Sequence, residues 1–185
     1  MAKRTNRAKS DETLAIDILE SRSATPVTIE SPSFANGDQI PDANADYGDG
    51  LSPELRWSGV PSGTQSLALM AEDPDAPKAP FTHWIVYNLP GGLRELPPSI
   101  PQHAELSQFD GALQGRSSAG SIGYFGPRPP ENDPPHHYHF ELFCLDTPLA
   151  LAPGAEKDQI IRAMSGHVLA KGELVGTYEA PVAGG

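Results

Sequence analysis

The segment GPRPPENDPPHHYHFELFCL, residues 126–145, decides the fold, because a loop rich in Gly and Pro leads directly into a strongly apolar run. The run Tyr138–Leu145 (YHFELFCL) combines aromatic and aliphatic side chains, which is typical of a β-strand. Successive side chains of a strand point to opposite faces. The spacing therefore predicts that His136 and Tyr138 share one face of the strand, above an apolar floor formed by Phe140, Leu142 and Cys144.

Shorter apolar runs, separated by turn residues, flank this segment on both sides. Those expected to be strands are Val27–Glu30, Leu67–Glu72, Trp84–Leu89 and Glu173–Glu179. Apolar residues at helical spacing predict one short helix at Leu14–Leu19 and another at Glu156–Met164. The stretch from Arg94 to Gly123 has few apolar pairs and is expected to be loop. These elements predict a mainly β fold, an antiparallel sandwich with one or two short helices.

The length of the chain favours one domain. With 185 residues, and with 20 Pro and 18 Gly scattered through it, the sequence predicts a single domain over residues 26–181. Residues 1–25 are expected to form an N-terminal extension, partly disordered or carrying the short helix, that packs against the domain or against a neighbouring molecule. A homodimer is one arrangement that such an extension would support.

The charge distribution limits the partners. Four of the 13 basic residues lie near the N-terminus, at Lys3, Arg4, Arg7 and Lys9. That leaves nine basic residues against 24 acidic ones for the rest of the chain, whose overall net charge is −11. A body this acidic repels nucleic acid and anionic lipid surfaces. An anion would therefore have to be held locally, by a few well-placed donors.

Other classes of protein are excluded by what the sequence lacks. No stretch of about 18 apolar residues is present, so no segment is expected to span a membrane. The N-terminus has no apolar signal region, and Cys144 is the single cysteine, so we expect a cytoplasmic protein without an internal disulfide. The usual nucleophile-elbow, phosphate-loop and zinc-protease motifs are absent, and no cofactor is expected.

Two aspartates flank a proline directly after the run Leu67–Glu72. Pro74 favours an extended conformation for Asp73, which would hold its carboxylate at the end of a strand. The alternative is an ordinary turn, in which Asp73 and Asp75 accept hydrogen bonds from nearby backbone N–H groups.

His83 stands at the start of the run Trp84–Leu89. Alternation predicts that its side chain shares a face with Ile85, Tyr87 and Leu89. A histidine in this position is either a ligand-binding residue or a structural one with satisfied hydrogen bonds.

The opposite face of the strand that contains Tyr138 carries His137, His139 and Glu141 at alternate positions. Two imidazoles and a carboxylate could bind a divalent metal ion. No further ligand follows downstream at a suitable spacing, which favours the alternative of a solvated polar face. No metal site is therefore predicted.

Together these segments resemble the phosphatidylethanolamine-binding protein family, in its bacterial and archaeal Raf-kinase-inhibitor-like branch. The resemblance rests on four stretches in the family's order, which are LSPELRWSGVPSGTQSLALMAEDPDAP, THWIVYNLP, GYFGPRPPENDPPHHYHFELFCLD and SGHVLAKGELVGTYE. It implies a Greek-key β-sandwich with a shallow anion pocket at one end. The residues that it assigns to the pocket are Asp73, His83, Pro129, Pro130, His136 and Tyr138.

The chemistry of such a pocket is coherent. A carboxylate beside two imidazoles is expected to raise the pKa values of both histidines. The protonated imidazoles and the Tyr138 hydroxyl would then donate hydrogen bonds to a phosphate or a carboxylate.

Four further residues are expected to support the pocket. Phe81 keeps an aromatic lid where some family members have Trp, and Gly126 retains a backbone N–H that the neighbouring prolines lack. His137 stands where family members usually have Arg, and it is expected to hold Asp75 in a pH-dependent way. The loop at residues 73–80 should therefore loosen above about pH 7, close to the ordinary range of histidine titration.

The function expected from these residues is the binding of a small anion or phosphate headgroup, without catalysis. The family name adds an alternative, an inhibitor of a protein kinase or protease that recognises a phosphate or acidic side chain on its partner. A further alternative is an enzyme that uses Asp73 with His83 or His136 as acid and base.

Overall fold

The structure, a computed structural model, describes residues 13–78 and 80–183. Its strands, in chain order, are β1 (Thr28–Glu30), β2 (Leu55–Ser58), β3 (Ser66–Asp73), β4 (Phe81–Pro90), β5 (Glu95–Leu96), β6 (Glu105–Leu106), β7 (Ala112–Gln114), β8 (His136–Leu145) and β9 (Val168–Tyr178). Its helices are α2 (Ala15–Ile18) and α3 (Lys157–Met164), with two short 3-10 turns, η1 (Asp42–Asn44) and η2 (Ser107–Phe109). The basic residues Lys3, Arg4, Arg7 and Lys9 lie outside the described residues.

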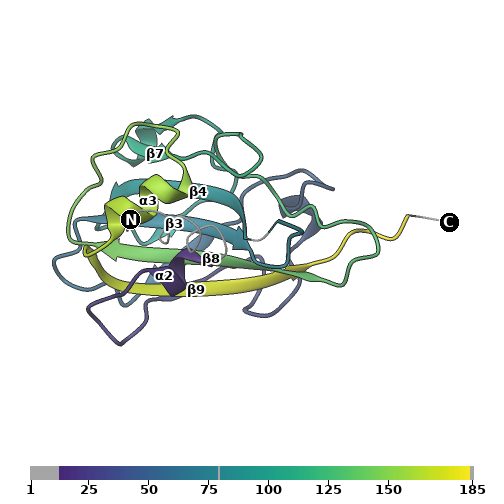
Figure 1. Ribbon diagram of the computed structural model, residues 1–185, viewed down its shortest axis with the longest axis horizontal. Coiled ribbons are helices and arrows are strands. Elements are labelled where there is room, and N and C mark those ends of the chain that lie inside the picture. Colours follow the sequence, from purple (N-terminus) through teal and green to yellow (C-terminus); the bar gives the residue numbers. More distant parts are fainter. Residues whose placement is uncertain (1–12, 79, 184–185) are drawn as a thin grey trace, which may run out of the picture.

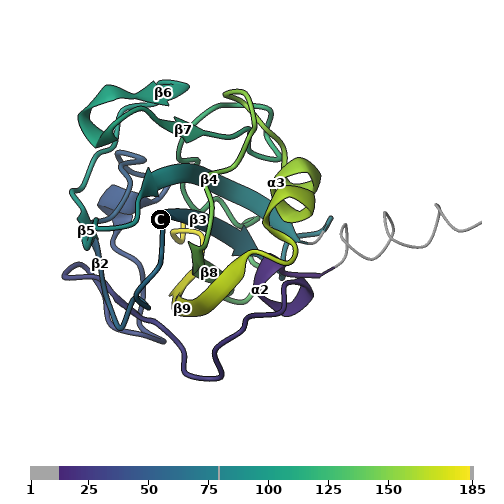
Figure 2. The same ribbon diagram turned by 90° about the vertical axis from the view of Figure 1, so that its left-hand side faces the viewer.

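Three layers are visible when the molecule is seen end-on (Figure 2). A small sheet with the strand order β1-β2-β5 lies on one side, and a six-stranded sheet with the order β6-β7-β4-β3-β8-β9 lies in the middle. Helices α2 and α3 cover the far face of the large sheet. The pairings between these strands are antiparallel. The predicted mainly β, antiparallel architecture is confirmed.

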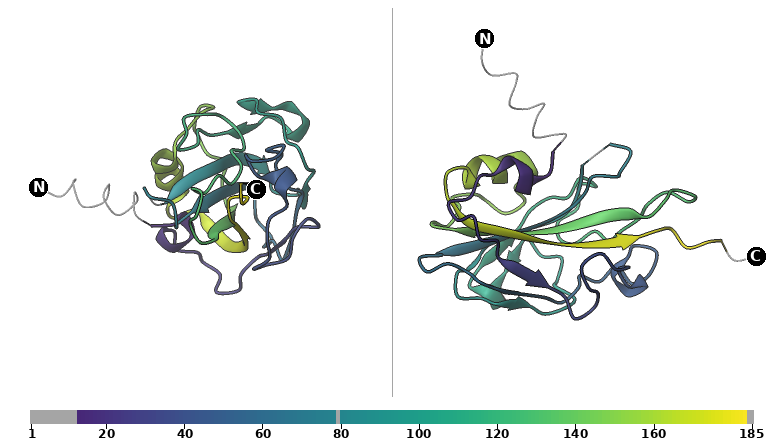
Figure 3. Two further views of the ribbon diagram at one scale, coloured as in Figure 1. Left: turned by 90° about the vertical axis from the view of Figure 1, so that its right-hand side faces the viewer. Right: turned by 90° about the horizontal axis from the view of Figure 1, so that it is seen from below.

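The large sheet is buried on both faces. Trp57, Trp84 and Phe140 belong to the core between the two sheets. Met70, Phe143 and Ile160 belong to a second core between the large sheet and the helices. The four long strands β3, β4, β8 and β9 run side by side along the long axis of the molecule (Figure 1), and from below, the helices and β1 lie on opposite sides of them (Figure 3).

The predicted helix at Glu156–Met164 is confirmed as α3. Glu156 precedes the first turn, where its side chain and that of Gln159 form a capping box. The helix buries Ile160, Ile161 and Met164 on one face, as their spacing requires. The other predicted helix is shorter than its apolar run, because only Ala15–Ile18 is helical.

The prediction that residues 94–123 are loop is wrong in part. This stretch contains β5, β6 and β7, which are only two or three residues long. Gln114 shows why they form. Its buried side chain accepts a hydrogen bond from the Trp84 indole N–H (2.8 Å) and donates to the carbonyls of Pro101 (2.7 Å) and His103 (2.8 Å). Partners distant in sequence create these strands, so local alternation does not reveal them. The last strand also begins earlier than predicted, at Val168.

The prediction of a solvated polar face on β8 is wrong at Glu141. Its side chain and that of Glu72 on β3 are both 0% exposed. The backbone N–H of Ala15 donates to Glu72 Oε2 (2.7 Å), and that of Ile16 donates to Glu141 Oε1 (3.1 Å). Lys157 forms an ion pair with Glu72. The N-terminal segment therefore covers this face at Glu72 and Glu141, while His137 further along the strand stays exposed.

Residues 13–25 lie against the large sheet along much of their length. The ammonium group of Lys171 on β9 donates to the carbonyls of Ile16 (2.6 Å) and Leu19 (2.7 Å). Further along, the backbone N–H of Arg22 donates to the carbonyl of Val168 (3.1 Å). No helix in residues 13–78 or 80–183 is long and apolar enough to cross a membrane.

Candidate functional site

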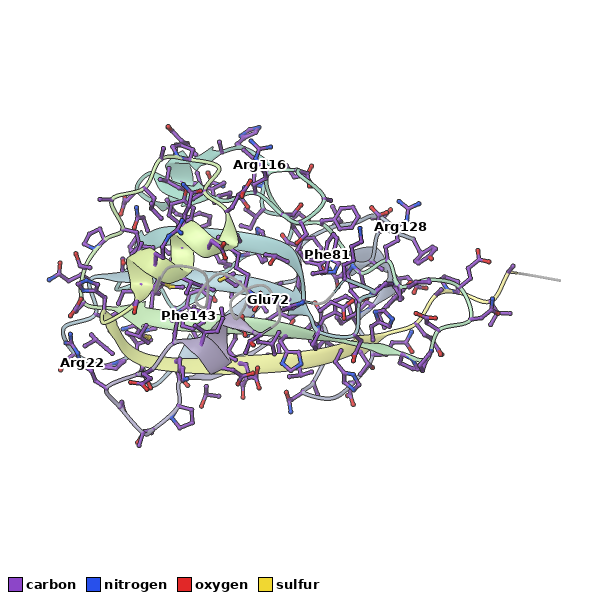
Figure 4. All side chains as sticks on the ribbon, viewed as in Figure 1. Arg22, Glu72, Phe81, Arg116, Arg128 and Phe143 are labelled. Carbon is purple, nitrogen blue, oxygen red and sulfur yellow. The ribbon has the colours of Figure 1, made fainter. Side chains whose placement is uncertain are left out.

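The predicted pocket residues come together at one end of the large sheet. Asp73 ends β3, Phe81 and His83 begin β4, and His136 begins β8. The loop at residues 123–135 closes the same end. Figure 4 labels Phe81 at this end of the strands, with Arg128 of the loop beyond it. The antiparallel order of the strands thus gathers side chains that are far apart in sequence.

Asp73 and His136 form a buried pair across β3 and β8. His136 Nδ1 lies 2.8 Å from Asp73 Oδ2, and both side chains are 4% exposed. The other carboxylate oxygen, Oδ1, accepts the backbone N–H of Asp75 (2.8 Å). Asp73 therefore combines the two roles considered for it: it closes the turn around Pro74 and holds an imidazole.

His136 carries hydrogens on both ring nitrogens. Its Nε2 lies 3.2 Å from Asp133 Oδ2, while its Nδ1 faces Asp73. Because an ionised carboxylate only accepts hydrogen bonds, this geometry favours an imidazolium ring in which both nitrogens donate. Burial alone would lower the pKa of His136, but the hydrogen bond and charge of Asp73, helped by Asp133, outweigh it and raise the pKa.

His83 behaves differently, and the prediction of a raised pKa is wrong for it. Burial lowers the pKa of His83, and the Phe125 carbonyl and the charge of Asp73 offset this only in part. The ring Nδ1 lies 2.6 Å from the Phe125 carbonyl oxygen, so Nδ1 carries the hydrogen. The Phe81 ring lies 4.7 Å from the His83 ring, between centroids. The pocket therefore contains one cationic and one neutral imidazole.

A β-bulge decides the direction of His83. The register pairs Ala71 with Trp84 and then Glu72 with Thr82, so β4 has an extra residue at His83. Its ring consequently lies 5.2 Å from the Tyr138 ring. The predicted shared face with Ile85 and Tyr87 is wrong, because those two side chains belong to the second core.

The same alternation fails once more near the end of β4. Leu89 belongs to the core between the sheets, with Trp84, and not to the second core with Ile85. The register shifts again between Leu67 and Leu69, and Asn88 has a positive φ of 57°.

Tyr138 contributes a donor that has no partner. The side chain is 2% exposed, and within the described residues its hydroxyl makes no hydrogen bond. Burial, reinforced by the nearby charge of Asp73, raises the pKa of the hydroxyl, which therefore stays protonated. A buried polar group without a partner costs about 1–3 kcal/mol. The Tyr138 ring lies over that of His136, with centroids 6.5 Å apart.

The loop that forms the pocket wall is closely fitted to the rest of the molecule. A Cβ atom at Gly126 would lie 2.7 Å from the backbone nitrogen of Asp46, so only glycine fits there. The carbonyl of Pro129 accepts a hydrogen bond from the Tyr47 hydroxyl (2.8 Å). Pro129 is buried and Pro130 is exposed. Sequence reasoning missed the parts played by Phe125 and Asp133, because only the folded loop brings them to the two histidines.

Asp75 and His137 form a separate pair just outside the pocket. His137 places both its backbone N–H and its ring Nδ1 2.8 Å from Asp75 Oδ2. Partial burial opposes the effect, but these hydrogen bonds lower the pKa of Asp75. The backbone bond does not depend on the charge of the ring, so it anchors the loop whether or not the ring is protonated.

The three residues considered as metal ligands do not converge. His139 Nδ1 lies 2.9 Å from Glu173 Oε2 on β9, whereas Glu141 faces the N-terminal segment. In residues 13–78 and 80–183 no group of three or more His, Cys, Asp or Glu side chains is arranged to hold a metal ion.

Proteins of several organisms are similar to this chain in sequence. A UPF0098 protein of Pyrococcus abyssi is 43% identical over 149 residues, which are 80% of this chain and 83% of the relative. A UPF0098 protein of Chlamydia muridarum is 42% identical over 156 residues, which are 82% of this chain and 97% of the relative.

Two crystal structures have a similar fold. A phosphatidylethanolamine-binding protein homologue of Chlamydia trachomatis superposes with a TM-score of 0.75 at 37% identity, covering 85% of this chain and all of the other. YbcL of Escherichia coli, described as a member of the mammalian family, superposes with a TM-score of 0.76 at 30% identity and the same coverage. The family model for phosphatidylethanolamine-binding protein matches residues 30–179, and the chain belongs to that family.

Proposed function

We propose that this protein binds a small anion, a phosphate or carboxylate group, at the end of β8. The observation that carries the proposal is the Tyr138 hydroxyl, a buried donor without a partner among the described residues, beside the imidazolium of His136. Native proteins seldom leave a buried donor unpaired, and such an atom commonly marks the place of a ligand or an ordered water. An anion is the group that a hydroxyl donor and a cationic donor would hold together.

The charge balance of the pocket supports a small anion over an extended acidic surface. The chain has a net charge of −11, so it does not attract anions at long range. Within the pocket, Asp73 fixes the positive charge on His136, and each of its carboxylate oxygens accepts a hydrogen bond. Charge-assisted hydrogen bonds in a buried setting are about twice as strong as neutral ones. The family description adds a source of such a group, the phosphate of a phospholipid headgroup.

A titration followed by NMR tests the proposal. Inorganic phosphate and phosphoethanolamine are added separately to the protein at pH 7, and the imidazole ring signals are recorded. We expect a saturable shift of the His136 signals. The Tyr138→Phe variant should bind roughly tenfold more weakly, because it loses one hydrogen bond to a charged group.

The control for this experiment is His139→Gln. His139 lies on the other face of β8, where it pairs with Glu173, so its loss should leave the affinity unchanged. Unshifted His136 signals at saturating phosphate would overturn the proposal, as would an equal loss of affinity in the two variants.

The other functions expected from the sequence lead to different results in the same samples. An inhibitor of a protein kinase or protease would slow such an enzyme, and that effect would be lost in Tyr138→Phe if the pocket recognises the partner. An enzyme would turn over a phosphoester, and turnover would vanish in Asp73→Ala. We place binding first because the unpaired hydroxyl is a binding feature. A cytoplasmic location stays a prediction from the sequence.

A further inference from the structure

Both hydrogens of the His136 ring already have acceptors within the protein. Nδ1 donates to Asp73 on the neighbouring strand, and Nε2 donates to Asp133, with 3.2 Å between Nε2 and Oδ2. The two aspartates differ in burial: the side chain of Asp73 is 4% exposed and that of Asp133 is 42% exposed. Asp73 is therefore part of the frame of the pocket, whereas Asp133 reaches His136 from the solvent side.

The loop is built to bring Asp133 to this position. The backbone N–H of Asp133 donates to the carbonyl of Pro130 (3.3 Å), which closes a four-residue turn. Asn132, the third residue of that turn, has a positive φ of 68°, a conformation that Asn tolerates better than most residues. Pro134 and Pro135 follow and restrict the backbone between the turn and β8.

We propose that Asp133 is an intramolecular competitor for the anion, and that it occupies the ligand's place on His136 Nε2 until a better acceptor displaces it. This inference rests on the proposed function of the pocket. The carboxylate of Asp133 uses one of the two donors and leaves the Tyr138 hydroxyl unpaired. A ligand with several acceptor oxygens, such as a phosphate group, can bond to both donors. An anion must therefore displace Asp133 from Nε2 before it can use both donors, and this requirement lowers its apparent affinity.

Competition of this kind has a quantitative signature. The apparent affinity of a ligand is reduced by the fraction of molecules in which its place is free. This fraction is a property of the protein, so removing Asp133 should strengthen the binding of every anion by the same factor. A purely electrostatic effect of the lost negative charge would instead favour phosphate over acetate, because phosphate carries more charge.

Glu131 provides a matched control in the same turn. It is exposed and acidic, and it lies two residues from Asp133. Glu131→Gln changes the net charge of the protein as much as Asp133→Asn does, without touching His136. Asp133→Ala is used in addition, because the amide oxygen that Asp133→Asn introduces could still accept the hydrogen bond from Nε2.

The experiment is a calorimetric titration of the wild type and the three variants with sodium phosphate and with sodium acetate, at constant ionic strength and pH 7. We expect Asp133→Ala to bind both anions about fivefold more tightly than the wild type. The gain is modest because the pair of Asp133 and His136, which the anion must break in the wild type, is partly exposed and therefore weak. Asp133→Asn should gain less, and Glu131→Gln should stay within about twofold of the wild type.

Two other results would overturn it. Equal affinities in Asp133→Ala and Glu131→Gln, or a gain confined to phosphate, would show that Asp133 does not compete, while anion binding itself would stand. Absence of binding in all four proteins would overturn the proposed function together with this inference. The His136 ring gives an independent readout: without ligand, its pKa should fall in Asp133→Ala and not in Glu131→Gln.

Discussion

Two side-chain atoms of β8, the Tyr138 hydroxyl and Glu141 Oε2, are buried without a hydrogen-bond partner among the described residues. They lie on opposite faces of the strand. The Tyr138 side chain packs in the core between the two sheets, next to His83 and His136, whereas Glu141 lies beneath the N-terminal segment. Under the proposed function the first would be paired by a bound ligand, and burial favours a proton on the carboxyl group of the second.

The ionisation of Glu141 is linked to the stability of the fold. Burial, followed by the charge of Glu72, raises the pKa of Glu141 well above its ordinary value, against the opposing effects of Ile16 and Lys157. An unfolded glutamate titrates near pH 4.3. The folded state is therefore favoured most below that pH, and it loses stability as the pH rises through the folded pKa.

The Glu141→Gln variant tests this at the scale of one residue. Glutamine cannot ionise, and its oxygen can still accept the hydrogen bond from Ile16. We expect the variant to be more stable than the wild type at pH 8, by roughly 1–3 kcal/mol, and similar to it at pH 4. Urea denaturation at the two pH values measures the difference. The exposed Glu179 supplies the control, Glu179→Gln, which should change little at either pH. A variant less stable than the wild type at pH 8 would contradict this account.

At the scale of elements, the loop between β3 and β4 depends on the pair of Asp75 and His137. The backbone bond from His137 does not depend on the protonation of the ring, while the ring contributes a positive charge only when it is protonated. The lowered pKa of Asp75 means that its contribution to stability is present above the ordinary aspartate range and is lost as the pH falls through the folded value. A neutral ring contributes no such charge, and the prediction from the sequence that this loop loosens above about pH 7 concerns the ring alone.

Hydrogen exchange of residues 73–78 measures this effect. Protection factors in the wild type should fall about two- to threefold between pH 6 and pH 8, a small change because the pair is half exposed. The His137→Arg variant keeps a permanent positive charge, so its protection should be the same at both pH values. Identical profiles in the two proteins would show that the ring adds nothing to the backbone anchor.

The elements also show how far the sequence predicts the site. Alternation along β8 predicted that His136 and Tyr138 share a face, and the resemblance alone predicted that Asp73 lies beside them. Strand β4 was predictable as a strand, but its face was not, because the bulge at His83 arises from pairing with β3. The low pKa of His83 depends on burial by Phe81 and Phe125, which no local pattern records. The contact between Asp133 and His136 could not be predicted either, because it depends on the folded loop.

At the scale of the whole molecule, the N-terminal segment is part of the second core. Leu14, Ala15 and Leu19 are buried against the large sheet, and the two buried glutamates accept backbone N–H groups from this segment. The sequence predicted an amphipathic helix here. It could not predict how fully the segment is buried, because Glu72 and Glu141 look like surface residues until their partners are in place.

Stepwise deletion tests this role. Removal of residues 1–21 should destabilise the protein by roughly 3–6 kcal/mol, the value of burying two leucine side chains, and should expose apolar surface that binds a hydrophobic dye. Removal of residues 1–12 alone deletes none of the contacts described above, and it serves as the control. Equal unfolding midpoints in urea for the two truncated proteins would show that the segment contributes no stability.

Two hydrogen bonds from the Lys171 ammonium group, to the carbonyls of Ile16 and Leu19, join the beginning of the described chain to its last strand. During synthesis, residues 13–19 leave the ribosome 144 to 155 residues before their partners on α3 and β9. We therefore expect these contacts to form only after β9 has been made. Contacts of such long sequence separation slow folding. We therefore expect the docking of residues 13–19 on the large sheet to be a late step of folding.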